Sequence, residues 1–275
     1  MRKNTKRNYQ LKRHECYNFC MELVLKKIEG EISSWKDKHY QVKDKIEPNK
    51  KFAIFSTPRT GSTALCNSLT SNGLGDVREY FNEMVLQQYN LSLKGKPMKF
   101  ANYVQTAFSQ GLSSDGIFGV NILINQFNHL MERKVNILGV KFDKIYLLQR
   151  KNKLKQAYSL MKSQKTFIFT PDILEEAQKK YGEIEIEADE VHFSICLSKI
   201  LREEAYIKGI LDGLSFKQIY FEDIISDNFA NSVKSIKSDL GLKLGDYISP
   251  IPSIMSNRSD TYVYGEILRK IGLGG

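Results

Sequence analysis

The feature that most constrains this chain is a strand-like run that turns at once into a helix, at residues 52–69 (FAIFSTPRTGSTALCNSL). The apolar run 52–55 predicts a buried strand, and 62–71 predicts a helix. Further strand-like runs at 117–122, 144–149 and 216–221 are separated by helical patterns. Parallel pairing through helical crossovers follows, so we expect an α/β fold with a central parallel β-sheet flanked by helices on both faces.

Helical periodicity marks the segments between the expected strands. It predicts helices at 79–89, 98–110, 125–133, 153–163, 172–181, 190–211 and 228–240. A stretch rich in Pro, Ser and Gly at 243–256 indicates a linker.

The loop between the first strand and its helix predicts an anion-binding site. Backbone N–H groups at a helix N-terminus have no partner within the helix and carry the positive end of its dipole. Hydroxyls of Thr60, Ser62 and Thr63 can donate further hydrogen bonds. Gly61 allows close backbone approach, and Arg59 supplies a forked donor for phosphate or sulfate.

A nucleotide-binding Walker A loop needs a second Gly and a Lys before its hydroxyl residue. The loop at 58–63 (PRTGST) has one Gly and no Lys. A nucleotide-dependent phosphotransferase is therefore disfavoured, although it stays an alternative.

The loop PRTGST resembles the 5′-phosphosulfate loop of sulfotransferases, in the form used by the bacterial trehalose sulfotransferase-type family. That family includes lipopolysaccharide and nodulation-factor sulfotransferases. The resemblance implies a P-loop-like sulfotransferase fold and 3′-phosphoadenosine 5′-phosphosulfate (PAPS) as co-substrate, with no metal. It assigns PAPS binding to Arg59, Thr60, Gly61, Ser62 and Thr63, and a catalytic role to Arg59.

A second match is the segment 75–81 (GDVREYF). In the family this segment ends on an acid followed by two aromatic residues, and the acid activates the acceptor hydroxyl. By that match Glu79 is the general base, and a partly desolvated carboxylate suits the task. The alternative is that Glu79 is a charge at a helix N-terminus.

A third match concerns the 3′-phosphate of PAPS, which the family holds with an Arg at a strand end and a later Ser. Arg150 and Ser159 fit that spacing, while the broader superfamily spacing selects Lys151 instead. Near the C-terminus, Arg258 in an Arg-Ser-Asp motif is a further candidate ligand.

The resemblance departs from the family at Asn121, where a Lys is usual in a segment that continues to Gln126. It covers residue 52 to the C-terminus and leaves the first 50 or so residues unmatched. We therefore expect a helical N-terminal extension at 1–51 and a sulfotransferase domain at 52–275.

The net charge of +10 belongs mostly to the extension, because residues 1–51 carry +7 and the remaining 224 residues carry +3. A helix is expected at 9–29, ended by Gly30, with an apolar stripe that includes Cys16 and Cys20. We expect the two cysteines to pack in a core rather than bind a metal. The basic helix either docks on the domain or lies on an anionic membrane or polymer.

The expected acceptor is a hydroxyl of a carbohydrate or glycolipid, as the resemblance implies. A non-catalytic protein that binds nucleic acid or another anionic polymer through its basic segment is the alternative, and it is disfavoured because the excess charge is concentrated in the extension. Homodimer formation and peripheral membrane contact stay open. Without an apolar run of about 20 residues, a soluble cytoplasmic protein is expected.

Overall fold

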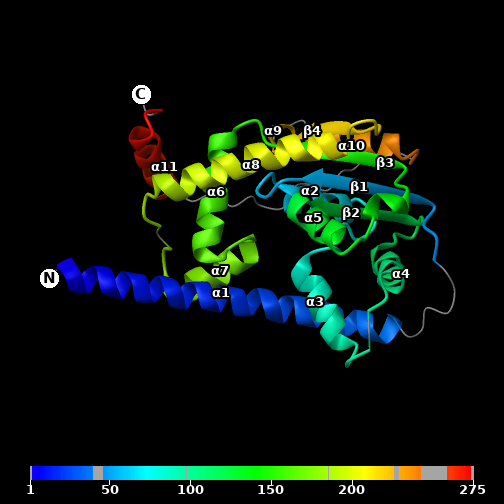
Figure 1. Cartoon of the computed structure of the whole chain (residues 1–275), viewed down its shortest axis with the longest axis horizontal. Coiled ribbons are helices and arrows are strands. Elements are labelled where there is room, and N and C mark those ends of the chain that lie inside the picture. Colours follow the sequence, from blue (N-terminus) through cyan, green and yellow to red (C-terminus); the bar gives the residue numbers. More distant parts are fainter. Residues whose placement is uncertain are drawn as a thin grey trace. The chain divides into compact units, whose positions relative to one another are not determined.

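The computed structural model describes residues 2–39, 46–96, 98–184, 186–225, 229–242 and 259–273, and these form two compact units (Figure 1). Unit 1 comprises Met1–Lys27, Asn152–Leu201 and Ser253–Gly275. Unit 2 comprises Ile28–Lys151 and Arg202–Pro252. The division into domains at residue 51 stays a prediction.

Unit 2 contains a sheet of four parallel strands in the order β2-β1-β3-β4. The strands are β1 (Lys50–Ser56), β2 (Ile117–Leu123), β3 (Lys144–Gln149) and β4 (Lys217–Tyr220). Each corresponds to a predicted strand, which confirms the α/β fold and its parallel pairing.

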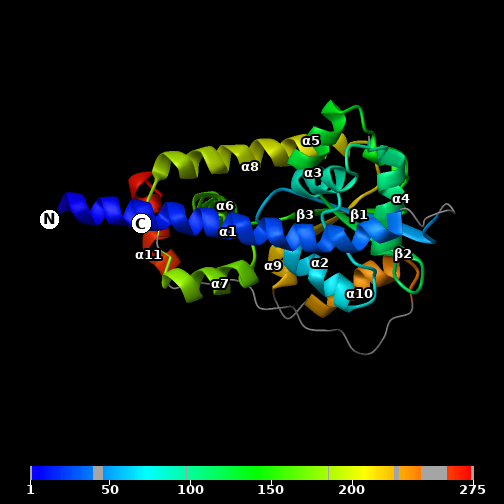
Figure 2. The ribbon, with the colours of Figure 1, turned by 90° about the horizontal axis from the view of Figure 1, so that it is seen from below.

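Both faces of the sheet are covered, as predicted. Successive side chains of a strand point to opposite faces. Phe52 and Ile54 of β1 therefore pack with α2 (Ser62–Ser71) and α10 (Phe229–Asp239). Ala53 and Phe55 pack with α3 (Glu83–Ser92), α4 (Phe100–Gly111) and α5 (Ile124–Glu132). Figure 2 shows α2 and α10 on one side of the strands and α3 and α5 on the other.

The N-terminal helix α1 (Arg2–His39) continues through Gly30, so the predicted end at Gly30 is wrong. Gly in a helix interior costs about 1 kcal/mol relative to Ala. Beyond it, Ile32 and Trp35 are each only 3% exposed and belong to the main core of unit 2. Burying such side chains contributes about 1.5–3 kcal/mol each, which outweighs the cost of the glycine.

Two further boundaries differ from the sequence prediction near the site. The predicted helix 79–89 begins only at Glu83, because the Asn82 side chain caps α3 by accepting from the Met84 N–H. Glu79 therefore precedes the helix and is not part of it. After β4 the chain enters a short helix, α9 (Phe221–Ile224), at a position where the pattern suggested continued strand.

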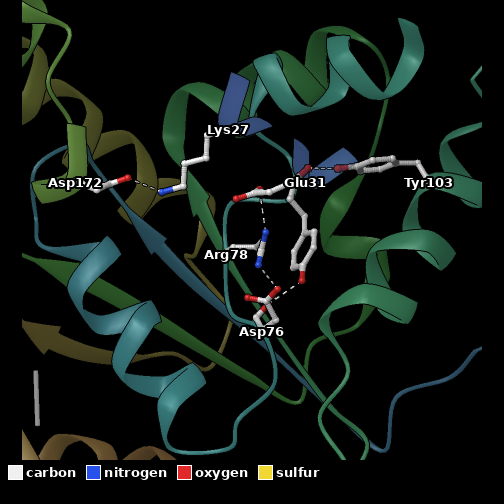
Figure 3. A network of polar contacts seen from close by, with 7 residues as sticks. Lys27, Glu31, Asp76, Arg78, Tyr103 and Asp172 are labelled. Atoms are coloured by element: carbon white, nitrogen blue, oxygen red, sulfur yellow. Dashed lines mark hydrogen bonds and ion pairs between the residues drawn. The ribbon is translucent and has the colours of Figure 1, made fainter. Parts of the chain in front are cut away.

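Unit 1 is helical. It contains the first part of α1 with α6 (Lys153–Thr166), α7 (Pro171–Tyr181), the beginning of α8 (Glu190–Ile210) and α11 (Ser259–Lys270). Cys16 and Cys20 of α1 are buried against Ile173 and Ala177 of α7, which confirms their predicted packing in a core. The Lys27 ammonium also contacts the Asp172 carboxylate at 2.9 Å (Figure 3).

The remaining regular segment is a 3₁₀ turn at Ile137–Val140 in unit 2. The predicted linker 243–256 lies outside the described residues. None of the described helices combines the length and the apolar character that a bilayer crossing requires.

Gly30 provides a test of the continuous helix. A Cβ added there meets nothing within 4 Å, so Gly30→Ala is expected to stabilise the protein by about 0.5–1 kcal/mol. Urea denaturation measures the change. The control is Gly75→Ala, whose Cβ would lie 2.3 Å from the Gly111 carbonyl oxygen and is expected to destabilise. A loss of stability in Gly30→Ala would contradict a helix that continues through residue 30.

Candidate active site

The predicted site residues of unit 2 gather at the carboxyl ends of the strands. The loop 57–61 follows β1, and Arg150 follows β3. After β1 the chain proceeds to β2 on one side of it and later to β3 on the other. Ligands of open parallel sheets bind outside the carboxyl ends at such a reversal of strand order. The topology therefore predicts a ligand site near the loop and Arg150, and this prediction does not depend on the sequence motif.

The loop after β1 turns sharply into α2 and leaves the helix N-terminus uncapped. Arg59 and Gly61 both have left-handed backbone conformations, with φ of 66° and 81°. No side chain caps α2, and its first turn carries no acidic residue. The first N–H groups of the helix thus have no acceptor from a cap, and together with the helix dipole they favour an anion.

The hydroxyls of the loop differ in what they can do. Thr60 is fully buried, and its Oγ1 donates to the Thr57 carbonyl oxygen at 3.0 Å. That bond closes the turn, so the part of Thr60 suited to a ligand is its backbone. Ser62 is 6% exposed, whereas Thr63 is exposed at the start of the helix.

Phe221 joins the loop to Arg150. A Cβ on Gly61 would lie 2.3 Å from Cδ2 of the Phe221 ring, so the ring packs directly against the glycine backbone. The guanidinium of Arg150 lies over the same ring, 4.5 Å from its centroid, in cation–π geometry. The first residue of α9 therefore places Arg150 beside the loop.

The two arginines of the site repel each other. Burial and the charge of Arg150 lower the pKa of Arg59 to about 10 from its usual 12.5. Arg59 also adopts a backbone conformation that costs a residue with a Cβ about 1–2 kcal/mol. An anion bound near Arg59 would raise the pKa of this arginine again, because opposite charge favours the charged form of a cation.

Lys151, the alternative to Arg150, is engaged elsewhere. Its backbone N–H donates to Glu222 Oε2 at 2.9 Å, and its Nζ lies 3.5 Å from Asp223 Oδ1. The ammonium also lies over the Tyr220 ring at 4.6 Å. Arg150 likewise lies over a ring, so the choice between the two residues as the 3′-phosphate ligand stays a prediction.

Glu79 is surrounded by side-chain amides. Its Oε2 accepts from Gln126 Nε2 at 2.6 Å and from Asn82 Nδ2 at 3.1 Å, and its Oε1 accepts from Asn121 Nδ2 at 3.3 Å. Burial raises the pKa of the Glu79 carboxyl above its usual value, while the three amides act in the opposite direction. The result is an oriented carboxylate that is more basic than a solvated one.

Asn121 connects this carboxylate to the loop. It lies on β2 and accepts through Oδ1 from the Ser56 hydroxyl at 3.2 Å, while its Nδ2 donates to Glu79. Ser56 is the last residue of β1. The residue that replaces the family's usual Lys therefore forms a hydrogen-bonded connection from the strand before the loop to Glu79.

Two predicted ligands are not placed by these contacts. Ser159 lies on α6 in unit 1, and Arg258 lies outside the described residues. Both stay predictions. In the part of the chain that the structure describes, no group of three or more His, Cys, Asp or Glu side chains could hold a metal ion.

The sequence prediction missed the residues that position the site. Phe221 was read as the end of a strand, and Asn82 carried no motif. Gln126 belongs to a segment that resembles the family, and this resemblance is the one sequence signal that could have identified it as a site residue. Each of these residues acts through a contact to a residue distant along the chain, and such contacts leave no local pattern.

The comparison with protein families identifies the chain's relatives. A model of the Stf0 sulphotransferase family matches residues 51–242. The match includes β1 from Lys51 onward with the loop that follows it, Glu79 and its three amide donors, Arg150 and Phe221. No curated protein matches the chain.

The contact between Gly61 and Phe221 can be tested with a matched pair of variants. Gly61 and Gly73 have similar φ, 81° and 83°, but a Cβ on Gly73 meets nothing within 4 Å. Both Gly→Ala changes therefore incur the left-handed backbone cost, and only Gly61→Ala adds a collision. We expect Gly61→Ala to lose about 1–3 kcal/mol more stability in urea denaturation. Equal losses would contradict the packing of the ring on the loop.

Proposed function

The chain belongs to the Stf0 sulphotransferase family, and from that premise we propose that it moves a sulfuryl group from PAPS to a hydroxyl of a carbohydrate or glycolipid. The observation that carries the donor assignment is the uncapped N-terminus of α2, with Arg150 held beside the loop through Phe221. PAPS carries an anionic group at its 5′ position and another at its 3′ position, so it supplies one anion for the loop and one for Arg150.

The 5′-phosphosulfate is assigned to the loop. The backbone N–H groups of residues 61–63 and the Arg59 guanidinium bind its oxygens, and the Ser62 and Thr63 hydroxyls add donors. The 3′-phosphate is assigned to Arg150. Ser159 and Arg258 are further ligands that the resemblance implies.

The proposed reaction is an in-line displacement at sulfur. The acceptor oxygen forms a new S–O bond while the bond from sulfur to the 5′-phosphate oxygen breaks, which releases adenosine 3′,5′-bisphosphate. Glu79 takes the proton of the acceptor hydroxyl. Negative charge grows on the departing phosphate oxygen, where Arg59 and the loop N–H groups stabilise it.

The acceptor class rests on the family resemblance. Phe81, Tyr89 and Tyr103, aromatic residues that follow Glu79, are at most 2% exposed and pack in the core. They are therefore assigned to the core and not to stacking on a sugar ring. Homodimer formation and contact of the N-terminal segment with a membrane stay predictions.

Calorimetric titration with adenosine 3′,5′-bisphosphate, with ADP as the comparison, tests the donor assignment. We expect selective binding of the bisphosphate. Arg150→Ala is expected to weaken it by about 10–100-fold, since a hydrogen bond to a charged group contributes about 1.5–3 kcal/mol. ADP affinity should change little because ADP has no 3′-phosphate.

Lys151→Ala is the matched control for Arg150→Ala, because it removes a neighbouring cation that Asp223 and Tyr220 already engage. It should leave bisphosphate affinity within about twofold. Equal binding of ADP and the bisphosphate by the wild type, or an equal effect of both variants, would contradict the assignment of Arg150.

Glu79→Gln is expected to retain bisphosphate affinity and to lose about 10²–10⁴ in turnover, the contribution typical of a general base. The assay follows release of adenosine 3′,5′-bisphosphate from PAPS with glycan and glycolipid acceptors. Because the base acts as the carboxylate, wild-type turnover should fall as pH decreases through the raised pKa of Glu79. Glu83→Gln, at an exposed position on α3, is the control. Full turnover in Glu79→Gln would remove Glu79 from the mechanism.

A further inference from the structure

The second part of α1 precedes the family match at residue 51, yet it packs in the core of unit 2. Its buried residues Ile32 and Trp35 belong to the same cluster as the sheet residues Phe55, Val120 and Ile122. This part of the chain therefore contributes to the unit that holds the candidate active site, although the family model does not include it.

Two contacts of the second part of α1 are with the neighbours of Glu79 in the sequence. Glu31 Oε2 accepts from Arg78 Nη1 at 2.9 Å. The rings of Trp35 and Tyr80 lie with their centroids 5.7 Å apart. Figure 3 shows Glu31 directed at Arg78, with Asp76 on the other side of the guanidinium.

The segment that carries Glu79 lies between helices and strands and depends on such contacts for its position. Arg78 forms an isolated parallel bridge with Val120, in which the Asn121 N–H donates to the Arg78 carbonyl at 3.0 Å. The Tyr80 hydroxyl donates to the Asp76 carbonyl at 2.8 Å, and the Tyr103 hydroxyl donates to the Tyr80 carbonyl (Figure 3).

The contacts alternate along this segment. Arg78 and Tyr80 contact α1, while Glu79 between them contacts Asn121 and Gln126. Arg78 lies in the isolated bridge with Val120, and the Asn82 N–H donates to the Glu79 carbonyl oxygen at 3.1 Å, which closes a turn directly after it. Because both residues that flank Glu79 contact α1, their positions fix the backbone from which the Glu79 carboxylate projects.

We propose that Glu31 and Trp35 of α1 are positioning residues that fix the Glu79 carboxylate through Arg78 and Tyr80. The inference rests on the proposed role of Glu79 as the base. Glu31 and Trp35 lie outside the family match and would affect turnover. Donor binding is assigned to other residues, those of the loop and Arg150.

The test variant is Glu31→Gln, which removes a half-buried ion pair whose effect on stability is expected to be small. Arg78 keeps its contact with Asp76, so the fold is retained. A displacement of about 1 Å at a reacting group can reduce rate by up to about 100-fold. We expect turnover of PAPS to fall about 10–100-fold, with bisphosphate affinity within twofold of the wild type. Glu29→Gln, at an exposed position on the same helix, should change neither.

Hydrogen–deuterium exchange gives a readout that does not depend on activity. Glu31→Gln should speed backbone exchange in residues 76–82 and leave residues 57–63 unchanged. Unchanged turnover and exchange would overturn the proposal. Parallel losses of bisphosphate affinity and turnover would also overturn it, because they would show that α1 only stabilises the fold. If the wild type fails to bind the bisphosphate, the proposed donor fails, while the exchange comparison still decides whether Glu31 holds this segment.

Discussion

The packing of the Phe221 ring against Gly61 and under Arg150 is the interaction on which the arrangement of the site depends. Arg59 lies in the loop after β1 and Arg150 follows β3, and burial together with the charge of Arg150 lowers the pKa of Arg59. The ring therefore joins the loop after β1 to the arginine after β3, at the place where the strand order reverses.

Glu79, the proposed base, is held by uncharged groups rather than by cations. Amides of Asn82, Asn121 and Gln126 surround Glu79, and amides orient a carboxylate without adding charge. A Lys at position 121 would bring a positive charge next to the base and lower its pKa. The uncharged Asn121 adds no such effect, and burial raises the pKa of Glu79, which suits the proposed role of this residue as a base.

The parts of the fold that depend on local pattern were predictable from the sequence. The four strands, the loop after β1 and its helix follow from apolar periodicity and from the position of Gly61. The predicted helix end at Gly30 is wrong because Ile32 and Trp35, which follow the glycine, pack in the core and stabilise the continued helix. The roles of Phe221 and of Glu31 depend on contacts between distant parts of the chain, which periodicity and motif spacing do not encode. The aromatic residues after Glu79 could be assigned to the core only once their burial was known.

A crystal structure of the protein with adenosine 3′,5′-bisphosphate tests the central claim most directly. The account predicts the 5′-phosphate on the backbone N–H groups of residues 61–63, within reach of Arg59, and the 3′-phosphate on the guanidinium of Arg150. A bisphosphate bound away from the end of β1, or one whose 3′-phosphate contacts Lys151 while Arg150 stays on Phe221 without a phosphate, would contradict it.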